Sequence, residues 1–227
     1  MLARLDKIGY EKPSPVQAGV IPLVMDEYDV IGQARTGTGK TAAFAIPILE
    51  QLDMSVVKPK PQALILAPTR ELAVQVENEF RRMAPDDVKS VCLYGGKPIK
   101  GQMNELARGC HVVVGTPGRV IDHLNRGTLN IDQLWFMVLD EADRMLDIGF
   151  RPDIEKILRR CPKEKQTLLL SATLSTKHEL SLTHAPVSSM RTSTGARSCV
   201  ECTYTERLAN IIGNTVNESV TRGSASL

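Results

Sequence analysis

The residues best suited to chemistry are the eight from Ala34 to Thr41, which read A-R-T-G-T-G-K-T. They stand between a short apolar run at 28–31, typical of a buried strand, and a run at 40–52 with apolar residues at helical spacing. A glycine-bearing turn between strand and helix directs backbone N–H groups and the positive end of the helix toward one point, which suits phosphate. Lys40 can then reach the outer phosphates of a nucleotide, and the Thr41 hydroxyl can ligate Mg²⁺.

This stretch departs from the general phosphate-loop pattern G-x-x-x-x-G-K-T at its first glycine, which is Ala34 here. The other pattern residues co-occur by chance on the order of 10⁻⁵ per position. The alternative is a plain strand-to-helix turn with a surface lysine, but the strand–turn–helix context favours phosphate. The candidate nucleotide-binding residues of the loop are Ala34, Arg35, Thr36, Gly37, Thr38, Gly39, Lys40 and Thr41.

A second acidic stretch, D-E-A-D at Asp140 to Asp143, follows the buried-strand pattern of residues 136–139. A carboxylate at a strand end near a phosphate loop is placed to hold Mg²⁺, so Thr41 and Asp140 are the candidate metal ligands. Glu141 can accept a proton from the attacking water or orient that water. The alternative, an acidic helix start, explains the acidity but not the accompanying phosphate loop. The candidate catalytic residues are Lys40, Asp140 and Glu141.

Two further motifs lie close to these in the expected fold. Ser171-Ala-Thr173 ends the next strand, and its hydroxyls are expected beside Asp143, where a link could couple the nucleotide site to the surface; an ordinary N-cap is an equal alternative. Near the N-terminus, Ser14 can cap a helix with Pro15 at its first position. The Gln17 amide on that helix presents a donor and an acceptor that match an adenine edge, although a capped loop explains the stretch equally well.

Three more loops share one character: each combines small residues or a helix N-terminus with a hydroxyl or an arginine. Such groups hold phosphates and sugars without reading bases. Individually each is more often a structural cap, but together on one sheet edge they form a plausible track for a nucleic-acid backbone. The loops contribute Pro68, Thr69, Arg70, Gly95, Gly96, Thr116, Pro117, Gly118 and Arg119.

Apolar runs and helical patterns alternate along the chain. Near-continuous apolar strands between helices indicate a parallel sheet covered on both faces, so we expect an α/β fold with a doubly wound, mostly parallel sheet. Loops at the carboxyl ends of such strands form the binding face. The expected strands are 28–31, 63–67, 91–94, 111–115, 136–140 and 167–170, and the expected helices include 70–82, 99–108, 119–125 and 154–160.

Composition narrows the classes of protein. The 227 residues suit one large domain or one domain plus an incomplete second, and 42% hydrophobic residues supply a core. A net charge of +2 does not by itself indicate nucleic acid, and 4% aromatic residues argue against recognition by base stacking.

Five scattered cysteines suit a reducing compartment, and Cys199-x-x-Cys202 lacks the second pair that a zinc site needs. No run approaches the ~18 apolar residues of a membrane span, so we expect an intracellular, cytoplasmic protein without a membrane partner, with a nuclear location left open.

In this order the motifs resemble those of the N-terminal RecA-like domain of DEAD-box RNA helicases, over roughly residues 2–192. The stretch from Gly9 to Gln17 looks like the Q motif of that family, and A-R-T-G-T-G-K-T like motif I. P-T-R-E-L-A at 68–73, Gly95-Gly96 and T-P-G-R at 116–119 resemble motifs Ia, GG and Ib. D-E-A-D and S-A-T resemble motifs II and III.

The resemblance implies an RNA-stimulated ATPase with ATP and Mg²⁺ as cofactors. The Q motif, with Tyr10, Lys12 and Gln17, would hold ATP together with motifs I and II. Motifs Ia, GG and Ib would hold one strand of single-stranded or locally duplexed RNA by its backbone, and bending of that strand would separate short duplexes. Asp143, Ser171 and Thr173 would couple ATP turnover to unwinding between domains.

The resemblance also implies a second RecA-like domain, of which little follows in this sequence. We expect residues 1–191 to form the ATP-binding domain and 192–227 to be a linker with a remnant of a second domain, or a disordered tail. In the family, arginines that face the γ-phosphate come from that second domain and contribute about 10³–10⁵ in rate. We therefore expect this chain alone to bind nucleotide weakly and to hydrolyse it barely.

Two other functions stay open at this point. One is a non-catalytic module that binds RNA or a protein partner, and the other is a DNA-directed P-loop ATPase that shares motifs I and II. D-E-A-D together with the Q and S-A-T motifs resembles the RNA family more than the DNA-directed one.

Overall fold

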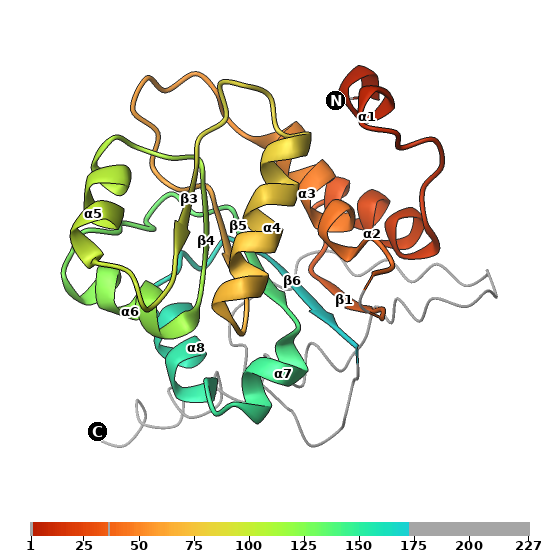
Figure 1. The fold of residues 1–227 in the computed structure, drawn as a ribbon. Helices are drawn as coiled ribbons and strands as arrows, with labels where there is room; N and C mark the ends of the chain where they lie inside the picture. The colour runs from red at the N-terminus through yellow and green to blue at the C-terminus, as the bar shows by residue number, and fades with distance from the viewer. Residues whose placement is uncertain (1, 36, 173–227) are drawn as a thin grey trace, which may run out of the picture.

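The computed structural model describes residues 2–35 and 37–172. The sequence predictions for Thr36, Thr173, the Cys199/Cys202 pair and the division at residue 191 lie outside these residues. Figure 1 shows the described elements along the chain. They are α1 (Leu2–Lys7), α2 (Pro15–Met25), β1 (Val30–Gln33), α3 (Lys40–Gln51), β2 (Ala63–Leu66), α4 (Arg70–Met83), β3 (Ser90–Leu93), α5 (Ile99–Ala107), β4 (Val112–Gly115), α6 (Pro117–Asn125), β5 (Phe136–Asp140), α7 (Ala142–Asp147), α8 (Arg151–Leu158) and β6 (Gln166–Ser171).

The six strands form one parallel sheet in the order β1-β6-β5-β2-β4-β3. The chain lays β1 near one edge, moves to β2 and β3, and then returns to insert β5 and β6 between β1 and β2. The carboxyl ends of β1 and β5 are thereby separated by the single strand β6. The prediction of an α/β fold with a doubly wound parallel sheet is confirmed.

The two faces of the sheet are covered by different helices because successive strand residues point to opposite sides. Ala63 and Ile65 of β2 pack with α2, α3 and α4 in one core, and Leu64 and Leu66 pack with α5 to α8 in the other. In Figure 1, α2, α3 and α4 follow one another across the same face. Every residue of β2, β4 and β5 is buried, as expected for a sheet covered on both sides.

Local sequence signals predicted where most of the helices begin. Ser14 caps α2 with Pro15 in the first turn, as expected. The predicted start of α6 at residue 119 was wrong by two residues: Thr116 is the N-cap and Pro117 opens the helix. The helix predicted at 154–160 begins earlier, at Arg151, because a proline in the first turn lacks only an N–H that would have no partner there. The strand predicted at 28–31 is Val30–Gln33.

Helix α7 was not predicted as a separate element. It begins directly after Glu141, its N-cap, whose backbone is left-handed with φ of +52°. This conformation turns the chain sharply from β5 into the helix, and it is uncommon for a residue with a Cβ. Among the described residues, no helix is both long enough and apolar enough to cross a membrane.

Gly115, at the end of β4, packs closely against the end of β3 and against α6. A Cβ added at Gly115 would lie 2.7 Å from the Leu93 carbonyl oxygen and 2.9 Å from a Val120 methyl. We expect Gly115→Ala to lower the free energy of unfolding by about 1–3 kcal/mol, because backbone must move to relieve the contact. Urea unfolding followed by circular dichroism measures this. Gly101→Ala in α5 is the matched control, since its Cβ would meet nothing within 4 Å, and it is expected to be neutral or stabilising. Equal stability of the two variants would contradict this account of the strand ends.

Candidate functional site

The phosphate-loop sequence forms a strand–turn–helix unit between β1 and α3. Gly37 and Gly39 have φ of +84° and +86°, a backbone conformation that L side chains rarely adopt. Gly39 is the N-cap of α3, and within the described residues no side chain caps that helix. The first N–H groups of α3 are therefore left for a ligand, and they favour an anion.

Gln17 ties α2 to this loop. Its Nε2 donates to the Gly39 carbonyl at 3.2 Å, and its Oε1 accepts from the Ser14 N–H at 2.9 Å. A side chain at Gly39 would be strained by the left-handed backbone, and its Cβ would displace the Gln17 amide, so the loop favours glycine there. The amide keeps one further N–H and one further lone pair, so the predicted adenine contact is compatible with these bonds and stays a prediction.

Lys40 and Asp140 are two buried side chains of opposite charge, and they are close enough for the lysine charge to act on the carboxylate. Each residue is only 6% exposed. Within residues 2–35 and 37–172, neither Lys40 Nζ nor Asp140 Oδ1 has a hydrogen-bond partner. Burial raises the pKa of Asp140 to about 6, and the charge on Lys40 acts in the opposite direction. Buried polar atoms are almost always satisfied, so this open pair fits a phosphate on the lysine and a metal on the carboxylate.

The metal site suggested here has one protein carboxylate. Among the described residues, no group of three or more His, Cys, Asp or Glu side chains is arranged to hold a metal ion. Mg²⁺ usually keeps several waters and binds through one or two carboxylates together with substrate phosphates, so the single carboxylate of Asp140 is compatible with it. Thr41, the second predicted ligand, lies in the first turn of α3 next to Lys40.

Glu141 and Asp143 both lie just after the end of β5, at the start of α7. The Glu141 carboxylate lies 3.2 Å from Arg144 Nη1, one turn along α7, and the residue is 9% exposed. Asp143 accepts from the Arg144 backbone N–H at 3.0 Å. Ser171 ends β6 and is 1% exposed, and its backbone carbonyl accepts a hydrogen bond from the Ala34 N–H at 2.9 Å. β6 thus lies between the two motifs, while the predicted Asp143–hydroxyl link stays a prediction.

The three remaining loops all follow strands of the other half of the sheet, β2, β4 and β3. Thr69 caps α4, with its Oγ1 accepting from the Leu72 N–H at 3.3 Å, so its structural role is confirmed. The Arg70 guanidinium lies 5.0 Å from the centre of the Tyr94 ring, and Lys97 Nζ lies at the same distance. Gly96 has φ of +82°. Two cations are therefore held together beside one buried ring.

Arg119, the arginine of the third loop, is hydrogen-bonded within the protein. Its side chain is 13% exposed, and Nη1 donates to the Lys97 carbonyl at 3.1 Å and to Gln102 Oε1 at 3.0 Å. It therefore joins α6 to the loop after β3 instead of projecting freely into solvent. Tyr94, Lys97 and Gln102 were not singled out from the sequence. Only the position of Tyr94 and Lys97 on either side of Gly95-Gly96 could have indicated them.

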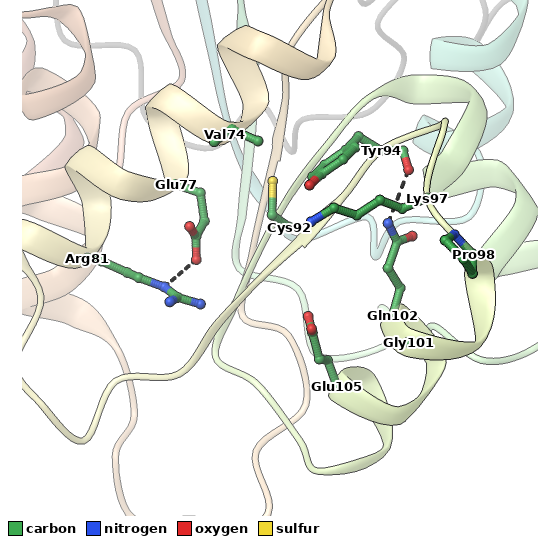
Figure 2. Close-up of a pocket in the computed structure, with 10 residues that line it drawn as sticks. All are labelled: Val74, Glu77, Arg81, Cys92, Tyr94, Lys97, Pro98, Gly101, Gln102 and Glu105. Carbon is green, nitrogen blue, oxygen red and sulfur yellow. Dashed lines mark hydrogen bonds and ion pairs between the residues drawn. The ribbon is translucent and has the colours of Figure 1, made fainter.

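A pocket of about 410 Å³ opens beside β3, between α4 and α5. Figure 2 shows Val74 and Glu77 on the α4 side, Gln102 and Glu105 on the α5 side, and the Lys97 amine reaching toward Cys92. Burial raises the pKa of Cys92 and Cys110 to about 12 and that of Cys161 to about 11. These three free thiols are therefore poor nucleophiles.

Comparison with known proteins agrees with this geometry. Residues 14–180 match the DEAD/DEAH box helicase family. The chain is 51% identical over 175 residues to the DEAD-box ATP-dependent RNA helicase CshA of Geobacillus kaustophilus, covering 77% of this chain and 37% of that protein. It is 52% identical over 170 residues to the mitochondrial DEAD-box ATP-dependent RNA helicase 9 of Arabidopsis thaliana, covering 73% of this chain and 28% of that protein.

A solved structure shows the same fold. The crystal structure of a DEAD box protein from the hyperthermophile Methanococcus jannaschii superposes with a TM-score of 0.73 at 47% identity, covering 78% of this chain and 48% of that one. The chain spans about a third of the length of the curated relatives it matches. Because the match runs through most of the sequence and includes every strand that carries a motif, this chain belongs to the DEAD/DEAH box helicase family.

Proposed function

We propose that this chain is the ATP- and RNA-binding N-terminal domain of an ATP-dependent DEAD-box RNA helicase. In the longer protein, ATP hydrolysis would be coupled to local separation of an RNA duplex, with a second RecA-like domain completing both sites. The observation that carries the proposal is the buried pair Lys40 and Asp140, each with a polar atom that lacks a partner among the described residues. The names of the relatives, which are RNA helicases, support the choice of RNA.

Each residue of the nucleotide site has a role that its position supports. The N–H groups of 37–41 would bind the phosphates, and Lys40 would neutralise the outer ones. Thr41 and Asp140 would hold Mg²⁺, which when bound shields the phosphate charge and polarises the phosphoryl group. Glu141, placed by its left-handed backbone beside Asp140, would take the proton of the attacking water.

The proposed RNA site lies on the other half of the sheet, at the ends of β2, β4 and β3. The ends of β2, β4 and β3 are adjacent, so the three loops after them form one continuous edge. That edge offers the cations Arg70 and Lys97 and the N-termini of α4 and α6. These groups suit a sugar-phosphate backbone, and they would not recognise the base sequence. Asp143, Ser171 and Thr173 would relay the state of the nucleotide to the second domain.

The free cysteines suit a reducing compartment, and we propose that the protein lies inside the cell, in the cytoplasm.

The second candidate function is a non-catalytic module that binds RNA or a protein partner. The open Lys40 and Asp140 atoms favour the nucleotide-binding domain over it, because a module without nucleotide would leave these buried groups uncompensated.

Removal of the lysine charge tests the nucleotide site. We expect Lys40→Ala to weaken binding of a fluorescent ATP analogue by about 10- to 100-fold, because a charge-assisted phosphate contact is lost. The matched control is Lys60→Ala, an exposed lysine in the loop before β2, which should bind like the wild type. Glu141→Gln should keep the affinity and lower any turnover by about 10²-fold or more. Unchanged affinity in Lys40→Ala would refute the nucleotide site.

The raised pKa of Asp140 predicts two opposite pH effects. Without metal, the folded protein takes up a proton on Asp140 near pH 6, before the unfolded chain does, so this residue's contribution to stability grows as pH falls from about 6 toward 3.8. Metal binding needs the carboxylate, so the Mg²⁺-dependent part of nucleotide affinity should weaken over the same fall in pH. Asp140→Asn should flatten both profiles, measured by urea unfolding and by Mg²⁺ titration. Parallel pH dependences of stability and of metal affinity would contradict the assignment.

A comparison of RNA with DNA tests the second site. We expect single-stranded RNA to bind more tightly than DNA of the same sequence, since the 2′-hydroxyl is the difference a backbone reader can sense. Arg70→Ala should weaken RNA binding, measured by fluorescence anisotropy, and reduce the slope of log affinity against log salt by about 1. The control is Arg82→Ala, at the other end of α4. Equal effects of the two substitutions would remove Arg70 from the RNA track.

A further inference from the structure

A buried polar cluster joins two of the strand-end loops behind the surface. Its centre is Gln102 on α5, which is 5% exposed. Gln102 Nε2 donates to the Tyr94 carbonyl at 3.1 Å, and this bond is drawn in Figure 2. Gln102 Oε1 accepts from Arg119 Nη1 at 3.0 Å and lies 3.1 Å from His123 Nε2. One amide therefore contacts the end of β3 and two residues of α6.

The chemistry of the partners determines how this amide is oriented. A carbonyl oxygen accepts only, so the NH₂ group must face Tyr94. A guanidinium donates only, so the amide oxygen must face Arg119. With that oxygen fixed as an acceptor, His123 Nε2 has to carry the proton that it shares with Gln102.

His123 is consequently held in one tautomer. Its ring is fully buried, and burial together with the charge of Arg119 lowers its pKa, while Asp122 acts to raise it and Arg126 to lower it further. The neutral ring with its proton on Nε2 leaves Nδ1 as an acceptor, and the Thr128 hydroxyl lies 2.8 Å from Nδ1. The same hydroxyl lies 3.2 Å from the His123 backbone carbonyl, so its single proton is shared between these two acceptors on His123, and Thr128 closes the cluster.

The cluster connects all three loops that follow β2, β3 and β4. Arg70, after β2, lies over the Tyr94 ring, and the Tyr94 carbonyl is bound by Gln102. Gln102 in turn holds Arg119, which also donates to the Lys97 carbonyl at 3.1 Å. The contacts run without a break from the start of α4 to the first turn of α6.

We propose that Gln102 is a positioning residue that fixes the loop 94–98 and the start of α6 relative to each other, so that their backbone-binding groups act together on one RNA strand. The proposal rests on the RNA site proposed above. Gln102 itself touches no RNA, since it is buried beneath the loops. Its removal leaves a carbonyl, an arginine and a histidine without the partner they share, and buried groups left this way are costly.

Three variants on α5 separate the possibilities. Gln102→Leu keeps the size of the side chain and removes every hydrogen bond. Gln102→Glu keeps an acceptor for Arg119 and His123 but loses the donor for Tyr94. Glu105→Ala, an exposed position one turn along the same helix and on the wall of the pocket, is the matched control.

Amide hydrogen exchange in residues 94–98 and 116–119 is the first measurement. We expect Gln102→Leu to raise exchange in both segments by about tenfold or more, and Gln102→Glu to raise it mainly in 94–98. Nitrogen-15 spectra should show His123 protonated on Nε2 in the wild type and a mixture of tautomers in Gln102→Leu. In Gln102→Glu the pKa of His123 should rise, because a carboxylate then faces the ring.

RNA affinity is the second measurement, with nucleotide affinity as the internal reference. We expect Gln102→Leu to weaken RNA binding by about tenfold while nucleotide binding at the β1 half stays unchanged. Exchange in both segments that matches the wild type would overturn the positioning role. Looser loops with unchanged RNA affinity would overturn it as well, because the loops would then move without consequence for RNA. If the wild type binds no RNA at all, the proposed function fails, and the exchange and tautomer data still decide whether Gln102 links the loops.

Discussion

The structure depends on two opposite charges kept away from water, Lys40 at the start of α3 and Asp140 at the end of β5. Burying a lysine and an aspartate is costly unless hydrogen bonds complete them, and a polar atom on each has none within the described residues. Such a pair persists because the surrounding sheet and helices hold it. It is what an ATP-binding site requires, since phosphate and metal would supply the missing partners.

The order of the strands explains why this pair can form. The insertion of β6 between β1 and β5 places the two motif-bearing ends two strand spacings apart, roughly 9–10 Å. That gap leaves room for phosphate and metal between a lysine and a carboxylate. The same order gathers β2, β4 and β3 in the other half, so one edge of the sheet carries the proposed nucleotide site and the proposed RNA site side by side. Ser171 and the Asp143 region lie on the nucleotide side.

Much of the fold and of the candidate site could be predicted from the sequence, because the sequence signals for them are local. Apolar strands between helical patterns, the Ser14 and Thr69 caps, and the glycines of the phosphate loop act within a few residues of chain, so sequence alone indicates them. The boundaries of α6 and α8 were missed because a proline in the first turn of a helix can be mistaken for a break before it. Helix α7 was missed because it depends on a left-handed glutamate, which sequence does not favour.

The sequence by itself determined the class of the fold, the phosphate loop and the acidic strand end, because each rests on residue types at short, regular spacing. Only the tertiary structure decided that the charge of Lys40 acts on Asp140, that Gln17 binds the Gly39 carbonyl, and that Arg119 turns inward to Gln102. These contacts join residues from 17 to 100 positions apart. Their geometry depends on strand order and on how helices pack over the sheet, and neither is written in the spacing of any single motif.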